Sequence, residues 1–299
     1  MRCTFFFILL TQWTISNALS KSEYFFVEGC NIRNSRGIPQ LILPGDYCLF
    51  LEDGTFFSST SKKLRAFNKN KSLLWEIEGV FFRISFTADK KSILAITSKN
   101  ILKISLRGKV ISQREMVLPD AFALTLYENP DGTIILSGPS VGVVILSSDL
   151  IQVINEIRIP NVVSSHLHDA QLLDQKQILF FNNQVKSSKS DSDYSAIQIF
   201  DQKASKIIFS FGPKPREFFY SSFGGGVDIV NSDLLLITHP STGIFLYSKK
   251  RKDIVFSTLE VHRSLSLFSI NYIQKVRLLD LHGFLKTWEV IARKPVELP

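Results

Sequence analysis

The stretch AFALTLYENPDGTIILSGPSVGVVILSSDLIQVINEI, Ala121 to Ile157, decides the fold class. It consists of short runs rich in Val, Ile and Leu that are bounded by Gly, Asn, Asp and Ser, a pattern typical of strands joined by turns. Its Asp131-Gly132 pair is a common signal for a tight hairpin. Similar runs continue along the chain and helical periodicity is almost absent, so the sequence predicts an all-β protein.

Turns of the same kind recur at Asp53, Asp89, Asp131, Gln175 and Ser232, at intervals of 36, 42, 44 and 57 residues. Each turn stands between two apolar runs and is followed by two further strand-like runs. A four-stranded unit of about 40 residues has the size of a propeller blade, and it must pack against other units to bury both faces. We therefore expect a six-bladed β-propeller, with a seven-bladed ring or two stacked sheets as the alternatives.

The chain from residue 21 to residue 299 is expected to form this single domain, with five units between Gly45 and Leu259. The segment from Leu265 to Val290 is expected to supply most of a sixth unit. A short strand within SEYFFVEG, Ser22 to Gly29, would complete that unit and close the ring. The polar, serine-rich segment from Asn182 to Ser195 is expected to be an inserted loop.

The first twenty residues have the layout of a secretory signal peptide. They contain Arg2, an apolar run from Cys3 to Leu10, and a polar part that ends in Ala18-Leu19-Ser20. The apolar run is far shorter than the roughly 20 residues that span a bilayer, which argues against an uncleaved membrane anchor. We expect residues 1–20 to be removed and the mature protein to be periplasmic or secreted, without a transmembrane segment.

Export determines how the cysteines and the charge are interpreted. Removal of a signal peptide leaves Cys30 and Cys48, which predict one disulfide in an oxidising compartment, with two buried thiols as the alternative. The five histidines show no metal-ligand spacing with either cysteine, and no cofactor is expected. The net charge of +8 favours anionic partners. Because the protein is expected to be exported, we do not expect nucleic acid to be among them. The basic run SKKRKD, Ser248 to Asp253, is expected to be a solvated turn.

The repeat also predicts which residues face the centre of a propeller. When the units are aligned on their turns, we expect the position seven residues before each turn to face the central channel. That position holds Asp46, Phe82, Phe122 or Leu124, His168, and Gly225 in the five successive units. The run Gly224 to Gly226 lacks the residues of a phosphate loop, and we expect it to let strands pack closely.

Three stretches carry a resemblance to a known family. They are HDAQLLDQKQILFFNN (His168 to Asn183), SSFGGGVDIVNSDLLLITHPSTGIFLYS (Ser221 to Ser248) and LLWEIEGVFFRISFTADKKSILAIT (Leu73 to Thr97). Together they resemble the blades of the bacterial aryl-sulfate sulfotransferase family. This resemblance implies an exported six-bladed propeller that transfers a sulfuryl group from a phenolic sulfate ester to a phenol, through a sulfated histidine and without a nucleotide donor.

The resemblance implies that His168 is the nucleophile, with His166 beside it on the same strand face and Lys186 in the place of a family arginine. From the residues themselves, we expect Arg83 to bind the anionic group of the substrate, a small aromatic or anionic molecule, with an outward, solvated side chain as the alternative. Phe82 is expected to form an apolar wall for the aromatic ring. A neutral imidazole is a nucleophile near neutral pH, and basic neighbours stabilise the transferring group. Where the family has His-His-Asp, however, this chain has Phe81-Phe82-Arg83.

Two other interpretations therefore stay open. In the first, the chain is a non-catalytic propeller that binds a ligand or another envelope protein. In the second, His168 is a structural residue that satisfies a buried backbone group or bonds Asp169.

Overall fold

The computed structural model of the chain describes residues 25–28, 30–34, 39–116, 124–138, 141–162, 167–174, 176–185, 194–212, 225–229, 232–239, 243–257 and 273–274. These residues form 24 strands and no helix, which confirms the all-β class. A helix long and apolar enough to cross a membrane is accordingly not found in the described ranges. The proposed signal peptide, residues 1–20, lies outside them.

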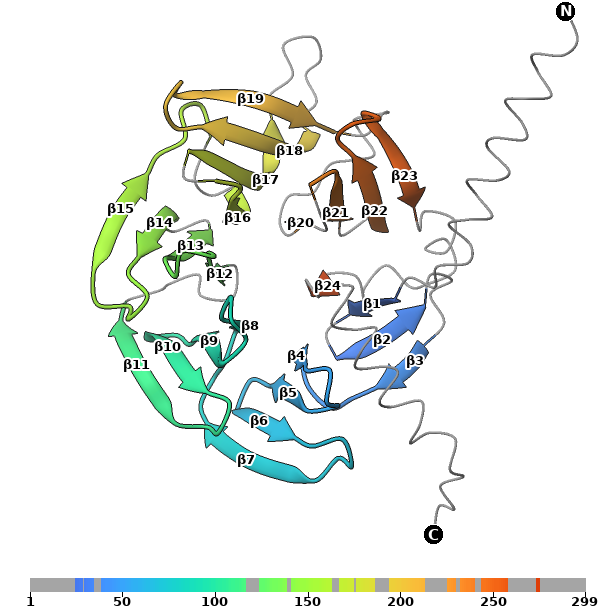
Figure 1. Cartoon of the computed structure of the whole chain (residues 1–299), viewed down its shortest axis with the longest axis vertical. Helices are drawn as coiled ribbons and strands as arrows, with labels where there is room; N and C mark the ends of the chain where they lie inside the picture. The colour runs from blue at the N-terminus through green and yellow to red at the C-terminus, as the bar shows by residue number, and fades with distance from the viewer. Residues whose placement is uncertain are drawn as a thin grey trace, which may run out of the picture.

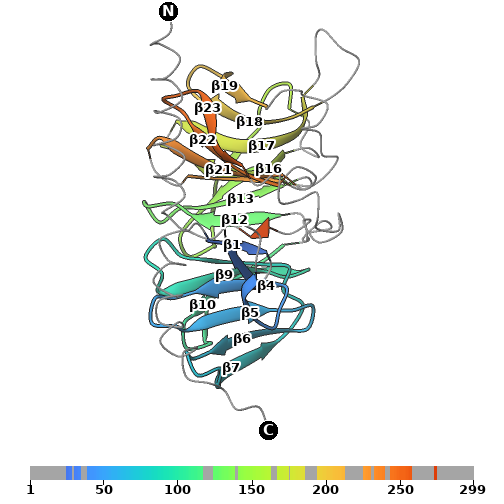
Figure 2. The ribbon, with the colours of Figure 1, turned by 90° about the vertical axis from the view of Figure 1, so that its right-hand side faces the viewer.

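The strands form six four-stranded antiparallel sheets, which lie side by side around a common centre in a propeller-like arrangement (Figure 1). Figure 2 shows the same sheets edge-on. Two of these sheets are each formed by four consecutive strands of the chain. The first contains β4 (Tyr47–Phe50), β5 (Phe56–Ser59), β6 (Lys63–Phe67) and β7 (Leu73–Glu78). The second contains β8 (Arg83–Phe86), β9 (Ser92–Ile96), β10 (Asn100–Ser105) and β11 (Val110–Glu115).

Three more sheets repeat this meander. One contains β12 (Thr125–Glu128), β13 (Ile134–Gly138), β14 (Gly142–Leu146) and β15 (Val153–Ile157). The next contains β16 (Leu167–Leu172), β17 (Gln177–Val185), β18 (Tyr194–Asp201) and β19 (Lys206–Phe211). The last contains β20 (Gly226–Ile229), β21 (Leu234–His239), β22 (Gly243–Ser248) and β23 (Asp253–Ser257). These five sheets match the five units expected between Gly45 and Leu259.

The remaining sheet joins the two ends of the chain. It contains β1 (Phe25–Glu28), β2 (Asn31–Asn34), β3 (Pro39–Ile42) and β24 (Ile273–Gln274). Val27 pairs with Gln274 and Glu28 with Ile273, so the strand expected within Ser22 to Gly29 does meet the C-terminal segment. Three of its four strands come from the N-terminal side, where β1 and β2 form a hairpin. Of the segment from Leu265 to Val290, only Ile273–Gln274 lies within the described residues.

The expected turns join the first strand of each sheet to the second. In the turn after β4, the Leu51 N–H donates to the Thr55 oxygen and the Gly54 N–H to the Leu51 oxygen. Asp53 Oδ1 accepts the Thr55 N–H at 2.8 Å, and Gly54 has a φ of 86°. This is a type I turn followed by a left-handed residue, one of the common short hairpin geometries. The Asp-Gly signal thus has a direct structural cause.

Hydrophobic clusters fill the spaces between neighbouring sheets. The second strands are buried on both faces, and alternate residues of one strand serve two different clusters because successive side chains point to opposite faces. In β9, for example, Ile93 and Ala95 join the cluster shared with β4–β7, whereas Leu94 and Ile96 join the cluster shared with β12–β15. This two-sided burial explains the continuous apolar runs of the sequence.

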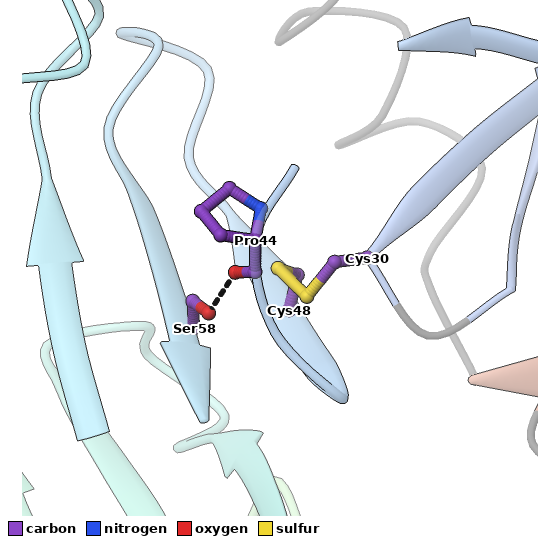
Figure 3. Close-up of a disulfide and its surroundings, with 4 residues drawn as sticks. All are labelled: Cys30, Pro44, Cys48 and Ser58. Atoms are coloured by element: carbon purple, nitrogen blue, oxygen red, sulfur yellow. Dashed lines mark hydrogen bonds between the residues drawn. A yellow bond between two sulfur atoms is a disulfide. The ribbon is translucent and has the colours of Figure 1, made fainter. Parts of the chain in front are cut away.

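Two local features, a glycine and a disulfide, bring neighbouring sheets close together. Gly225 has a φ of 102°, and a Cβ at this position would lie 2.6 Å from the Phe181 ring, so the expected close packing at the glycine run is confirmed there. Cys30, in the turn between β1 and β2, forms the expected disulfide with Cys48 on β4, with a Cα–Cα distance of 4.9 Å. Figure 3 shows this bond beside Pro44 and Ser58, whose hydroxyl donates to the Pro44 oxygen.

Candidate functional site

Figure 1 shows β4, β8, β12, β16 and β20 among the strands nearest the centre of the ring, and each of these five strands carries a polar side chain of interest. Tyr47 lies on β4, Arg83 on β8, Tyr127 on β12, Asp169 on β16 and Asp228 on β20. We call these five residues the inner-strand cluster. They come from the first strands of five consecutive sheets, so the cluster is assembled by the fold and not by any local sequence.

Asp169 occupies an irregular point of β16. The pairing of β16 with β17 shifts register between His168 and Gln171, and Asp169 has a φ of 54°, in the left-handed region that Asp tolerates better than most residues. A bulge of this kind redirects a side chain. The carboxylate is only 5% exposed, and a buried carboxylate requires hydrogen-bond donors.

Two donors from neighbouring sheets meet this carboxylate. The Tyr127 hydroxyl donates to Oδ1 of Asp169, and the Val227 N–H donates to Oδ2 at 2.7 Å. Gln171 adds a third link, because its Nε2 donates to the Val227 oxygen at 2.5 Å. The side chains of the His-Asp-Ala-Gln stretch therefore join three sheets, those of β12, β16 and β20.

The backbone of the bulge is held as well. The Ala170 N–H, which has no partner on β17, donates to Ser137 Oγ at 2.9 Å. Ser137 Oγ also shares a hydrogen bond of 2.8 Å with Thr125 Oγ1. Each of these groups is buried or half-buried, so the contacts fix the conformation in which Asp169 faces its donors.

The electrostatics of the cluster are seen at Tyr127. Burial raises the pKa of the Tyr127 phenol well above its ordinary value, and the charge of Asp169, its hydrogen bond with Tyr127 and the charge of Asp228 raise the pKa further. The positive charge of Arg83 acts in the opposite direction. Tyr127 therefore stays protonated and donates its hydrogen bond across the ordinary pH range, while Arg83 and Asp228 lie near enough to influence it.

Arg83 is the cation of the cluster. Its Cζ lies 4.7 Å from the centroid of the Tyr47 ring, a cation–π distance. Its Nε is buried and has no hydrogen-bond partner among the described residues. A buried N–H that is not satisfied by the protein is uncommon and requires an explanation, such as a bound ligand or water.

The residues predicted from the sequence are distributed unevenly around this cluster. His168 lies on β16, is 6% exposed and pairs in register with Phe181. Phe82 is half-buried and packs against the cluster that contains Leu94 and Ile96, so Tyr47 and not Phe82 is the aromatic ring in contact with the Arg83 guanidinium. His166 and Lys186 lie outside the described residues.

The alignment on the turns missed Tyr47, Tyr127 and Asp228, but the sequence carries a signal for them. The face that begins one position later holds Tyr47 and Leu49, Arg83 and Ser85, Thr125 and Tyr127, Asp169 and Gln171, and Gly226 and Asp228. This face is largely polar in strands that are otherwise apolar. Side chains alternate between the two faces of a strand. The alternation of polar residues therefore identifies the face that carries the cluster, whereas the position seven residues before each turn lies on the other face.

The cluster offers one cationic group, two carboxylates and two phenols. Within the described ranges, no group of three His, Cys, Asp or Glu side chains is placed to hold a metal ion. Arg83 is also the one lysine or arginine in the described residues of β4, β8, β12, β16, β20 and β24. The arrangement suits recognition of a single anionic group by a guanidinium beside an aromatic ring.

Comparisons with known proteins show that the arrangement of strands recurs elsewhere. No family model matches the sequence, and no curated protein sequence matches it. Among solved structures, the chain is similar to a protein of unknown function from Bacteroides caccae, with a TM-score of 0.58 and 14% sequence identity over 79% of this chain and 93% of that one. At this identity, the similarity concerns the fold alone.

Proposed function

We propose that the protein is an exported six-bladed β-propeller whose inner strands bind a small aromatic anion without converting it. The six sheets in Figure 1 support the blade count, and the disulfide between Cys30 and Cys48 supports export, because disulfides persist in oxidising compartments. The ligand class follows from Arg83 and Tyr47, the cation and the aromatic ring that contact each other in the inner-strand cluster.

The observation that carries this proposal is the state of the Arg83 guanidinium. Its face is occupied by Tyr47 and its buried Nε lacks a partner among the described residues. A guanidinium held by one face keeps its edge for a planar or tetrahedral anion, which it binds through paired N–H groups. A carboxylate or sulfate group on an aromatic body would satisfy this edge, with Tyr47 as the aromatic side chain that contacts the guanidinium.

Three features favour binding over catalysis. Both oxygens of Asp169 are engaged by Tyr127 and Val227, so the acid next to His168 has a structural task. His168 is almost completely buried, which leaves little room for an in-line approach to its imidazole. Sulfuryl transfer needs positive charge around several equatorial oxygens, whereas Arg83 is the one lysine or arginine in the described residues of the inner strands.

Transfer of a sulfuryl group through His168 is the second candidate function. One placement favours it: His168 lies on β16, one of the strands nearest the centre, and Arg83 lies on β8, which is another. Both residues thus stand on the strands that line the middle of a propeller, as the family resemblance requires.

Replacement of Arg83 by glutamine tests the binding proposal. The wild-type protein is expected to bind members of a panel of aryl sulfates and aryl carboxylates saturably in isothermal titration calorimetry. Arg83→Gln removes the paired N–H donors and the positive charge, so the affinity is expected to fall by about tenfold or more. The neutral parent phenols should bind no better to the wild type than to Arg83→Gln.

Arg65→Gln is the matched control. Arg65 lies on β6, is partly exposed and pairs with Glu76 at 2.6 Å, so its loss changes the net charge equally without touching the cluster. Equal affinities in the two variants, or no binding of any anion by the folded wild type, would refute the proposed role of Arg83.

A further inference from the structure

A second surface lies away from the centre, where the third strand of a sheet turns into the fourth. Five such turns are described, at residues 68–72, 106–109, 147–152, 202–205 and 249–252. They contain nine lysines and arginines and a single acid, Asp149: the basic residues are Lys69, Lys71, Arg107, Lys109, Lys203, Lys249, Lys250, Arg251 and Lys252. The net charge of these turns is +8, equal to that of the whole chain, so the excess positive charge of the protein is concentrated here.

The topology places the five turns at one end of the sheets. Strands alternate in direction within each antiparallel sheet, and the five sheets repeat the same order from the innermost strand to the outermost. All turns between third and fourth strands therefore share a side, together with the turns between first and second strands.

Exposed aliphatic side chains follow these turns directly. Leu73 and Leu74 open β7 and are 54% and 53% exposed, and Val110 and Ile111 open β11 at 41% and 55%. The same occurs at the start of β15 and within β19, with Ile151, Val153, Ile154 and Ile208 exposed by 67%, 39%, 55% and 44%. Scattered exposed aliphatic residues are normal, but here they recur at or near the start of the outermost strand in four of the sheets.

The inner turns on the same side differ in charge. In the described part of the turns between first and second strands, Asp and Glu outnumber Lys, with Glu52 and Asp53 in one turn and Asp131 in another. The positive charge therefore lies at the periphery, in four of the five outer turns, and not over the centre. We call the five turns together with the aliphatic residues beside four of them the basic rim; the turn at residues 147–152 contributes aliphatic residues but no Lys or Arg.

We propose that the basic rim docks the protein onto an anionic lipid bilayer. Each Lys or Arg near such a surface is attracted by the negative potential of its headgroups, and the neighbouring aliphatic side chains enter the interface between headgroups and acyl chains. The combination of basic and aliphatic side chains favours a bilayer over an acidic polymer as the partner. An acidic polymer would attract the lysines but would offer no apolar layer for Leu74 or Ile111. This surface is distinct from the inner-strand cluster and does not depend on a ligand there.

Co-sedimentation of the full chain with vesicles tests this proposal. The protein is expected to bind vesicles that contain phosphatidylglycerol, to bind phosphatidylcholine vesicles weakly, and to be released by salt. The variant Lys69→Gln/Lys109→Gln/Lys250→Gln is expected to lose affinity by on the order of a hundredfold at low salt. The variant Leu74→Ser/Ile111→Ser/Ile154→Ser is expected to lose on the order of tenfold. All six residues are exposed, so both variants should fold.

A matched variant on the other side of the sheets is the control. Lys62→Gln/Lys99→Gln/Arg158→Gln removes the same charge from exposed positions at the opposite strand ends, and its affinity should stay within about threefold of the wild type. Equal binding to neutral and anionic vesicles, or an equal loss in this control, would overturn the proposal. A loss in the basic variant with no change in the aliphatic variant would also overturn it and would indicate an acidic polymer.

Discussion

Replacement of Asp169 by alanine is expected to lower the free energy of unfolding by about 3 to 4 kcal/mol. The change leaves the Tyr127 hydroxyl and the Val227 N–H without their acceptor, and an unsatisfied buried donor costs about 1 to 3 kcal/mol. Alanine also tolerates the φ of 54° less well than aspartate does. Urea unfolding of the purified protein measures the loss.

Two further variants separate the parts of this effect. Asp169→Asn keeps the backbone conformation and one acceptor oxygen, so its loss should be about half as large. Asp131→Ala is the control, because Asp131 also bonds a backbone N–H, that of Thr133, but in an exposed turn. An Asp169→Ala variant no less stable than Asp131→Ala would show that the contacts among β12, β16 and β20 do not hold the sheets together.

The pH dependence gives an independent check of the environment of Tyr127, in which burial first and the charge of Asp169 second raise the pKa of the phenol. The pKa of Tyr127 is raised well above 10.0 in the folded protein, so the folded state keeps a proton that the unfolded chain releases. This contribution to stability is fully present below pH 10.0 and is lost as the pH rises through the folded value. Tyr127→Phe should therefore show a smaller alkaline loss of stability than the wild type.

Loss of the disulfide between Cys30 and Cys48 is the other large effect we expect. The bond closes a loop with a sequence separation of 18 residues, for which the chain-entropy account gives about 3 kcal/mol. It also ties β4 to the sheet in which β1 meets β24. The Cys30→Ala/Cys48→Ala variant is therefore expected to unfold at a clearly lower urea concentration than the oxidised wild type.

Reduction provides the control for this expectation. Cys30 and Cys48 are 2% and 0% exposed, so a reductant should reach them slowly under native conditions and rapidly once the sheet opens. Added reductant should lower the unfolding midpoint of the wild type towards that of the double variant and leave the variant unchanged. A wild type whose midpoint is the same with and without reductant would contradict the stabilising role.

Much of the fold could be predicted because its signals are local. Asp53-Gly54 and Asp131-Gly132 specify hairpins through hydrogen bonds within five residues, and the continuous apolar runs reflect second strands packed on both faces. The pairing of Cys30 with Cys48 followed from their number and spacing once export was assumed. The strand order of the closing sheet was only partly predicted, because the pairing of β1 with β24 joins segments about 245 residues apart that carry no local signal.

The candidate site was harder to predict for a physical reason. The turn-based alignment assumes that each strand is regular up to its turn, but the bulge after His168 shifts the register of β16 and redirects Asp169 towards Tyr127. The contact between Arg83 and Tyr47 likewise joins two sheets, so it cannot be predicted from the sequence around either residue alone. Such sites depend on how units meet, and the sequence of a single unit does not contain that information.

The measurement that tests the central claim most directly is turnover of a chromogenic aryl sulfate with a phenol acceptor, compared between the wild type and His168→Ala. We predict that the folded wild type binds the ester through Arg83 and releases no phenol, and that His168→Ala behaves in the same way. Release of phenol by the wild type that is lost in a stably folded His168→Ala variant would contradict the account and establish the protein as a sulfuryl-transferring enzyme.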